Sequence, residues 1–212
     1  MFWIQMMYKN REDAAEQLLT YLQKYKKDPA SIVLALPRGG VVIGDIIAKK
    51  LNIPLDIIIS KKIPSLSSDE LAIGAVCEDI IYLNEKILKE LNIADDLLQN
   101  QISLTKKRIL EKKKLYNKEN SNLNLKDKTI ILVDDGIATG ASIIAAIEAI
   151  KARKAKKIIL CSPVAPFEVI EEIKPLVNEL ICPIISNAFY AVGQFYLDFT
   201  EISDEQVKTI LK

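Results

Sequence analysis

The sequence predicts an α/β protein with a doubly wound, mostly parallel sheet, organised as a single domain over residues 1–212. Two observations predict this class: short apolar runs typical of strands buried on both faces, and intervening segments whose apolar residues recur at helical spacing. The strand patterns of Ser31–Leu36 and Leu55–Ile59 enclose a helical pattern over Gly40–Asn52, which is a βαβ unit. The chain is 50% hydrophobic, which is enough for one buried core.

The other elements follow in chain order. Asn10 with Asp13 three residues later is typical of a helix start, and the apolar residues after it predict a helix that ends near Lys27. Beyond the βαβ unit, the stretch from Ile63 to Glu70 lacks periodicity and predicts a loop. We then expect strands at 75–77 and 80–83, helices at 84–91 and 94–116, a strand at 129–133, a helix at 141–153, a strand at 157–161, a helix at 167–174, a strand at 180–184 and a last helix capped by Ser203 and Gln206.

Two segments depart from this alternation of strands and helices. Residues 84–124 combine two helical patterns with a polar, linker-like stretch, and we expect them to form a helical insertion. Residues 186–202 are the second segment and include an aromatic-rich stretch. The helix at 94–116 has two basic runs, 106–108 and 112–114, which could contact nucleic acid or an acidic surface. A solvated helix face is the better interpretation, because acidic residues elsewhere balance the charge and no aromatic ladder accompanies the basic residues.

The amino-acid composition indicates which kinds of binding partner and which cellular location to expect. Lys and Arg number 29 and Asp and Glu 28, so no global field draws the chain to nucleic acid or to a membrane. Pro183 and Gly193 interrupt the uncharged stretch at 180–197, and residues 1–8 lack the basic start of a signal peptide. The three cysteines show no CxxC spacing and indicate reduced thiols, so we expect a cytoplasmic protein. The chain contains no histidine, which leaves other groups to move protons.

The most informative stretch is Ile130–Ser142, with the sequence IILVDDGIATGAS. It joins an apolar strand to two carboxylates, Asp134 and Asp135, then to a small-residue loop and a helix start. The carboxylates can accept hydrogen bonds from vicinal hydroxyls, and the backbone N–H groups at the start of the helix can surround a phosphate. A polar strand-to-helix turn without a ligand is the plain alternative. A Walker-type nucleotide site is excluded because no Gly-Lys-Ser/Thr follows.

This stretch resembles the 5-phosphoribosyl diphosphate (PRPP) motif of the type I phosphoribosyltransferases, and the resemblance covers most of the chain. It is strongest to a group described only as predicted phosphoribosyltransferases. The matching pieces are Leu-Pro-Arg-Gly-Gly at 36–40, Glu-Leu-Ala-Ile-Gly-Ala-Val at 70–76, the PRPP motif, and the aromatic stretch at 189–199. The resemblance implies PRPP binding by Asp134, Asp135, Gly136, Ile137, Ala138, Thr139, Gly140, Ala141, Ser142, Arg38, Gly39, Gly40, Lys61 and Lys62.

The resemblance also assigns roles. Asp134, Asp135 and Arg38 are implied to be catalytic, with the acids on the ribose and the turn of Arg38, Gly39 and Gly40 facing the diphosphate. Pro-Arg-Gly-Gly alone is a weak signal and is more often a structural turn. The residues from Lys61 and Lys62 through 63–73 are implied to form a lid that keeps water from the reacting carbon, with an ordinary surface loop as the alternative.

The aromatic segment at 186–202 resembles the hood that holds the nucleophilic base in this family. Phe189 and Tyr190 are implied to stack on a heterocycle, and backbone groups near Ala191 and Val192 to read its edge. Asp198 is implied to reach the metal of the diphosphate through water, although a solvated loop acid is the better account. Core packing explains the other aromatic residues of the segment just as well.

The resemblance predicts a Mg²⁺-dependent phosphoribosyltransferase of nucleotide metabolism, which passes the phosphoribosyl group to a nitrogen base and releases diphosphate. The metal would be carried mainly by PRPP, with Asp134, Asp135 and Asp198 contributing indirectly. Ala138 departs from the 6-oxopurine members, which have an Asp there, so hypoxanthine and guanine are unfavoured. The rival hypothesis is a non-enzymatic PRPP sensor, and a hydrolase of PRPP or a nucleotide is a third. We expect a homodimer whose partners are PRPP and a base that the sequence does not name.

Overall fold

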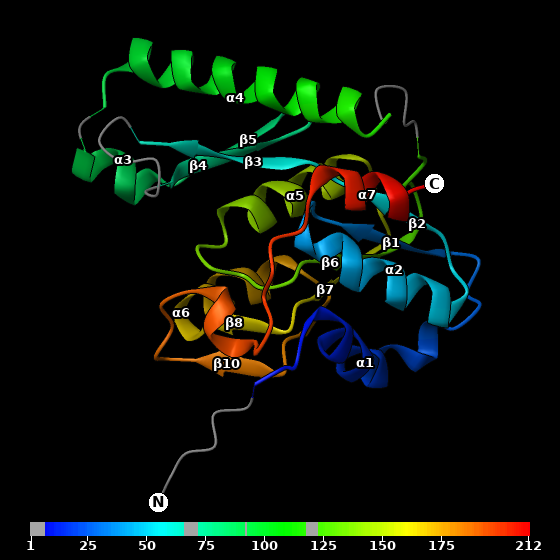
Figure 1. Ribbon diagram of the computed structural model, residues 1–212. Coiled ribbons are helices and arrows are strands. Elements are labelled where there is room, and N and C mark those ends of the chain that lie inside the picture. The colour runs from blue at the N-terminus through cyan, green and yellow to red at the C-terminus, as the bar shows by residue number, and fades with distance from the viewer. Residues whose placement is uncertain (1–6, 66–71, 92, 118–122) are drawn as a thin grey trace, which may run out of the picture.

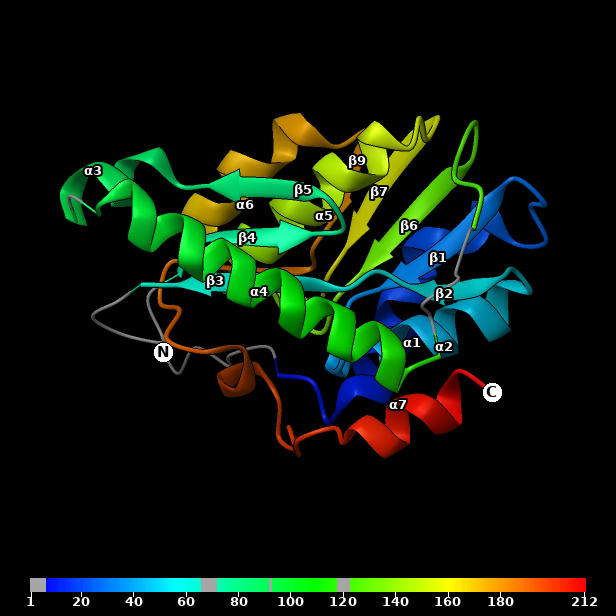
Figure 2. The same ribbon diagram turned by 90° about the horizontal axis from the view of Figure 1, so that it is seen from above.

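The computed structural model describes residues 7–65, 72–91, 93–117 and 123–212. Its centre is a five-stranded parallel sheet in the order β2-β1-β6-β7-β9 (Figures 1 and 2). The strands are β1 (Ser31–Ala35), β2 (Leu55–Ile57), β6 (Thr129–Val133), β7 (Lys157–Cys161) and β9 (Glu179–Ile181). This confirms the mostly parallel α/β class that the sequence predicted.

Helices cover both faces of this sheet. Helices α1 (Arg11–Leu22) and α2 (Gly39–Leu51) pack on one face, while α5 (Ala141–Ala152) and α6 (Phe167–Ile173) pack on the other. Alternate residues of one strand therefore enter different cores: Ile130 and Leu132 face α5, and Ile131 and Val133 face α1 and α2. Burial on both faces is why these strands have no polar alternation in the sequence.

A second, antiparallel sheet lies above the first in Figure 1 and has the order β3-β4-β5. Its strands are β3 (Ser60–Pro64), β4 (Ala72–Cys77) and β5 (Ile80–Leu83). Helix α4 (Asp95–Leu115) packs on its outer side and α5 on its inner side, and α3 (Glu85–Leu91) precedes α4. The prediction of a loop over 63–70 was wrong at its first residues, because Ile63 and Pro64 belong to β3 and pair with β4. Pairing with β4, rather than a local sequence pattern, makes this stretch a strand.

The C-terminal part also differs in detail from the expectation. The strand expected at 180–184 is two strands, β9 and β10 (Ile184–Ser186), because Pro183 has no N–H to continue the ladder. Strand β10 pairs with the short β8 (Val164–Pro166) outside the main sheet. Helix α7 (Asp204–Ile210) begins at the predicted cap, where the Ser203 side chain accepts a hydrogen bond from the Gln206 N–H. The described residues also form three 3₁₀ turns: η1 (Gln23–Tyr25), η2 (Lys174–Leu176) and η3 (Val192–Phe195).

The N-terminal end of the described chain lies against the aromatic segment. Tyr8 forms a parallel bridge with Tyr196, and its hydroxyl donates to the Pro163 carbonyl at 3.0 Å. Asn10 caps α1 by accepting from the Asp13 N–H, as the sequence predicted. Within the described residues, no helix has both the length and the apolar character needed to span a bilayer.

Candidate active site

The two motifs meet at the carboxyl ends of adjacent strands. Strands β1 and β6 pair in parallel register, with Ala35 opposite Val133. Their connections leave the sheet on opposite faces, β1 into α2 and β6 toward α5. This is the switch point at which open α/β sheets bind ligands. A Cβ built on Gly40 would lie 2.9 Å from both the Asp134 Cα and the Val133 carbonyl oxygen, so only glycine allows this approach.

A cavity of about 210 Å³ opens at this point over the loop that follows β6. Gly140 caps α5 with φ +75°, a conformation that L side chains rarely adopt. The first N–H groups of α5 begin next to it, so the loop has the geometry of an anion site. The lining residues are Lys62, Asp134, Gly136, Ile137, Ala138, Thr139, Gly140, Ser142 and Ile143.

Asp134 is the carboxylate that faces this cavity. Burial raises the pKa of its carboxyl group well above 3.8, and the charge of Asp135 raises it further, while the Lys62 ammonium opposes the shift. One carboxylate oxygen of Asp134 accepts a hydrogen bond from the Asp135 N–H at 2.9 Å. A ligand with hydroxyls and a cation would therefore stabilise the ionised form that burial disfavours.

Asp135 is directed elsewhere, although it is adjacent in sequence. Its Oδ2 accepts from the Nε of Arg11 at 2.7 Å, and the two side chains are only 15% and 8% exposed. A Cβ on Gly39 would lie 1.7 Å from that Oδ2, so the glycine turn covers the ion pair. The Tyr196 hydroxyl donates to the Asp135 carbonyl at 2.7 Å.

Arg11 is a residue of this site that the sequence reasoning did not single out. Besides Asp135, its guanidinium donates to the Thr200 carbonyl at 2.8 Å and lies 4.0 Å from the ring centroid of Phe199. It thus joins α1, the loop after β6 and the aromatic segment. The only available signal was its position directly after the helix cap Asn10, which says nothing about a partner 124 positions away.

The three basic residues that the resemblance assigned to PRPP binding lie in different surroundings in the structure. Arg38 follows a cis peptide bond and forms an ion pair with Glu201. Lys62 lines the cavity of Asp134. Lys61 lies in a different cavity with Pro37 and Arg38, because successive residues of a strand point to opposite faces.

The structure places Val192 of the expected hood against this loop as well. A Cβ on Gly136 would lie 2.2 Å from the Val192 Cγ1, so Val192 lies directly on the loop after β6. Phe189 packs on Phe195 with ring centroids 5.4 Å apart, and Tyr190 is 92% exposed. The N–H groups of Tyr190 and Ala191 both donate to the Gln194 side chain.

Asp198 lies outside the lining of this cavity, and of the expected lid Lys62 lines it. Asp198 accepts hydrogen bonds from the Thr200 hydroxyl and N–H, which lower its pKa, and it does not line the cavity of Asp134. The ends of the expected lid at 61–64 and 72–73 are strand residues, and its middle, 66–71, lies outside the described residues.

The fit to Mg²⁺ rests on Asp134. Among the described residues, no three acidic or cysteine side chains gather in a way that could hold a metal by themselves. Asp134 offers an oxygen ligand that burial has made costly to ionise, and a dication bound with a phosphorylated ligand would offset that cost. The residues therefore fit a metal that arrives with a ligand.

A glycine-capped loop at a helix start and a carboxylate at the switch point of a doubly wound sheet are typical of α/β proteins that bind phosphorylated sugars or nucleotides. Residues 4–200 match the phosphoribosyl transferase domain family. The chain belongs to this family.

The relatives agree with this assignment. Proteins of two Mycobacterium tuberculosis strains, each named only as a candidate phosphoribosyl transferase, are 32% identical to the chain over 209 residues. The match covers 97% of this chain and 46% of each relative, so the chain spans about half the length of these curated relatives. A crystal structure of a Thermus thermophilus protein is 32% identical, with a TM-score of 0.80 over 97% of this chain and 98% of that one.

A more distant neighbour shares the fold alone. The crystal structure of a hypoxanthine phosphoribosyltransferase from Staphylococcus aureus is 9% identical. The comparison covers 84% of this chain and 74% of that one, with a TM-score of 0.50.

Proposed function

We propose that this domain binds Mg²⁺-PRPP and transfers its 5-phosphoribosyl group to a nitrogen heterocycle, releasing diphosphate. The observation that carries the proposal is the shared cavity of Asp134 and the loop 136–142, with the glycine turn of Gly39 and Gly40 packed behind it. The loop N–H groups would hold the 5′-phosphate, and Asp134 would accept hydrogen bonds from the ribose hydroxyls.

In the reaction, the bond from the anomeric carbon to the diphosphate oxygen breaks, and a bond from that carbon to the acceptor nitrogen forms. The bonding electrons leave with the diphosphate, and the acceptor loses a proton. Bound Mg²⁺ would neutralise part of the diphosphate charge. Arg38 and Lys62 would add positive charge on the leaving-group side, and positioning by the loop would supply most of the rate.

The acceptor base would bind on the side of the aromatic segment. Tyr190 is the exposed ring available for stacking, because Phe189 is already packed against Phe195. Ala138 offers no carboxylate to exchange a proton with a 6-oxopurine. We therefore expect a planar nitrogen base to be accepted, with hypoxanthine and guanine poor.

Diphosphate release from PRPP, followed with Mg²⁺ and a panel of bases, tests this proposal. We expect at least one base to stimulate release, and Tyr190→Ala to raise KM for that base while PRPP affinity stays nearly unchanged. Tyr21→Ala, which removes an exposed ring on α1, is the matched control. PRPP binding with no base-stimulated release would instead support the non-enzymatic PRPP sensor, and release without a base would support a hydrolase. As part of this proposal, we expect the protein to be a homodimer located in the cytoplasm.

A further inference from the structure

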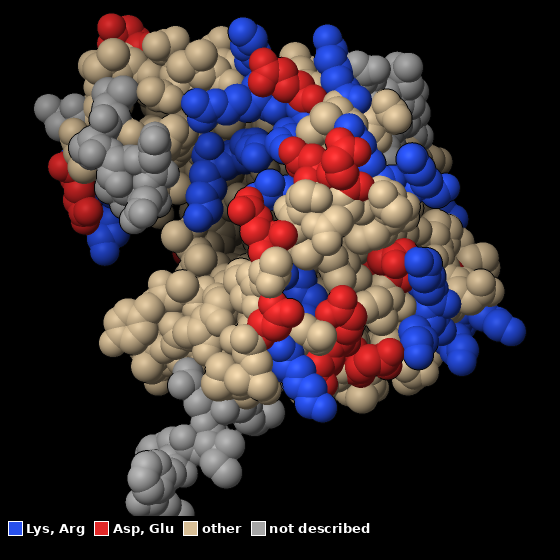
Figure 3. All heavy atoms as spheres, viewed as in Figure 1, with Lys and Arg blue, Asp and Glu red and all other residues tan. Residues whose placement is uncertain are grey.

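An uncharged surface covers the part of the molecule that contains β8, β10 and the start of α6. Residues 158–167 and 180–197 contain no charged side chain, in a chain that is 27% charged. Figure 3 shows this feature as a broad tan area at the lower left, over β8, β10 and α6, whereas Lys and Arg side chains gather between α4 and α7. We call this surface the uncharged face.

The uncharged face exposes large apolar side chains. Phe167, Ile185, Tyr190 and Leu197 are 48%, 46%, 92% and 72% exposed. The cores of protein interfaces are depleted of charged residues and enriched in aromatic ones. Apolar side chains exposed in segments without charge are therefore typical of a surface that a partner covers.

Strand β10 gives this face an open sheet edge. Among the described residues, β8 is the only strand that pairs with β10. The Ile184 N–H donates to the Pro163 carbonyl just before β8 at 3.1 Å, so the N–H and C=O groups of the next residue, Ile185, point to the unpaired edge. A sheet of two short strands is marginal by itself, and charged residues normally protect such an edge. Strand β10 contains none.

A second copy of the chain is the partner that suits both the edge and the face. Two identical strands related by a two-fold axis pair antiparallel, so two copies would form one four-stranded sheet in the order β8-β10-β10-β8. Each residue near the axis then meets its own copy, which makes a charge there repulsive and an uncharged surface favourable. A nucleic acid or an anionic membrane surface would instead need basic residues, which these segments lack.

We propose that the uncharged face joins two copies of this chain, with β10 of one copy paired antiparallel to β10 of the other and Ile185 next to the two-fold axis. The proposal assigns the expected homodimer to a particular surface. It does not depend on whether the chain binds PRPP, because it uses no residue of the cavity over Asp134.

Sedimentation equilibrium of the full chain over a range of concentrations tests this proposal. We expect the wild type to sediment with twice the mass of one chain. Ile185→Lys and Ile185→Glu should each raise the dimer dissociation constant at least about tenfold, because each places like charges next to the axis. An equimolar mixture of these two variants should regain the wild-type mass, since opposite charges then face each other across the axis.

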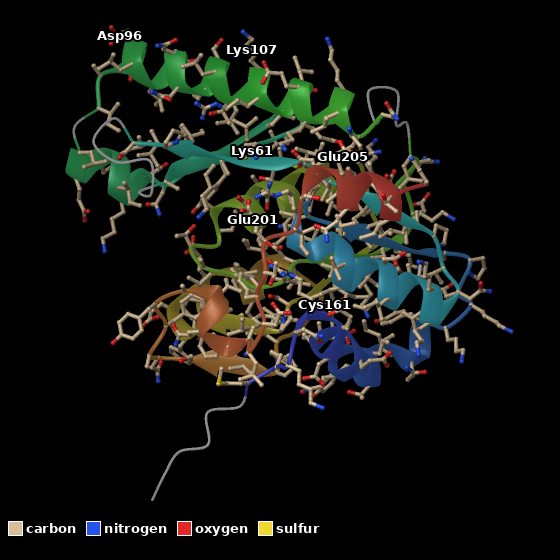
Figure 4. All side chains as sticks on the ribbon, in the orientation of Figure 1. Lys61, Asp96, Lys107, Cys161, Glu201 and Glu205 are labelled. Atoms are coloured by element: carbon tan, nitrogen blue, oxygen red, sulfur yellow. The ribbon has the colours of Figure 1, made fainter. Side chains whose placement is uncertain are left out.

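Leu104→Lys is the matched control, because Leu104 is 43% exposed, nearly as much as Ile185. It lies on α4, at the opposite end of the molecule from β10, where Figure 4 labels Asp96 and Lys107. This variant should dimerise like the wild type. Thermal melting checks that every variant is folded, and Phe167→Lys, which is outside β10, should also weaken the dimer.

A monomeric wild type would overturn the proposal and leave the uncharged face to a different partner. Dimerisation of Ile185→Lys as tight as that of Leu104→Lys would overturn it as well. If the Ile185 variants do not fold, Phe167→Lys decides, and an unchanged dimer in that variant would contradict the proposal. Folded Ile185 variants that remain monomeric when mixed would show that Ile185 does not lie next to the axis.

Discussion

The Nε of Arg11 lies 2.7 Å from the Oδ2 of Asp135. Because of this ion pair, the adjacent carboxylates of Asp134 and Asp135 have different roles. Asp135 is held under the glycine turn by Arg11 of α1, while Asp134 lines the cavity together with Lys62. Because the same guanidinium also holds the Thr200 carbonyl, the pair fixes the aromatic segment relative to the loop.

Arg11→Met should destabilise the fold strongly. It leaves the Asp135 carboxylate buried without its cation, and breaking such a pair costs about 3 kcal/mol. Chemical denaturation measures the loss in the free energy of unfolding. Lys50→Met is the control, since its pair with Glu16 is 61% and 55% exposed and should cost under about 1 kcal/mol. Equal losses in the free energy of unfolding would show that the Arg11–Asp135 pair stabilises the fold no more than the control pair does.

Asp134→Asn should weaken PRPP binding about 10- to 100-fold, because a hydrogen bond to a charged group contributes about 1.5–3 kcal/mol. Calorimetry with Mg²⁺-PRPP measures this. Asp96→Asn, at the exposed start of α4, should bind like the wild type. Unchanged affinity in Asp134→Asn would remove the basis of the proposed function.

The same substitution should stabilise the free protein at neutral pH. The folded pKa of Asp134 lies above 3.8, so the native state binds this proton more tightly than the unfolded state. The wild-type free energy of unfolding therefore falls as the pH rises from about 3.8 through the folded pKa, and Asp134→Asn lacks this fall. Melting curves should show a higher Tm for the variant at pH 7 and a vanishing difference below pH 3.8; a lower Tm at pH 7 would contradict this account.

Arg38→Ala should weaken PRPP binding, whereas Glu201→Gln should not. Removing the guanidinium should weaken PRPP more than ribose 5-phosphate, which lacks the diphosphate. Glu201→Gln frees Arg38 from its acidic partner and should leave PRPP affinity equal or tighter. Both ligands titrated against both variants test this; equal losses of the two ligands in Arg38→Ala would return the turn to a purely structural role.

Gly136→Ala should disturb the contact between the loop and the aromatic segment. Its new Cβ would lie 2.2 Å from the Val192 Cγ1, so the two segments must move apart. We expect lower stability and weaker PRPP binding, and partial recovery of both in Gly136→Ala with Val192→Ala. Chemical denaturation and calorimetry of the two single variants and the double variant form a double-mutant cycle. Strictly additive effects would mean that this contact does not matter.

Much of the fold could be predicted because its signals are local. The fully apolar strands, the caps at Asn10 and Ser203, and the helical spacing of α2 and α5 each depend on neighbouring residues. Strand β3 could not be predicted in this way. Its pairing with β4 comes from long-range contact, and a polar stretch such as Ser60–Lys62 has no periodicity of its own.

The sequence by itself determined the loop after β6, because thirteen consecutive residues contain the strand end, the acids and the helix start. The tertiary structure decided which surroundings each of two adjacent residues faces, for Asp134 and Asp135 and again for Lys61 and Lys62. Arg11 reaches Asp135 across 124 positions, and the two faces of β3 send Lys62 and Lys61 to different cavities. The reason is physical: backbone geometry is set locally, whereas the partner of a charged side chain is set by which elements pack together.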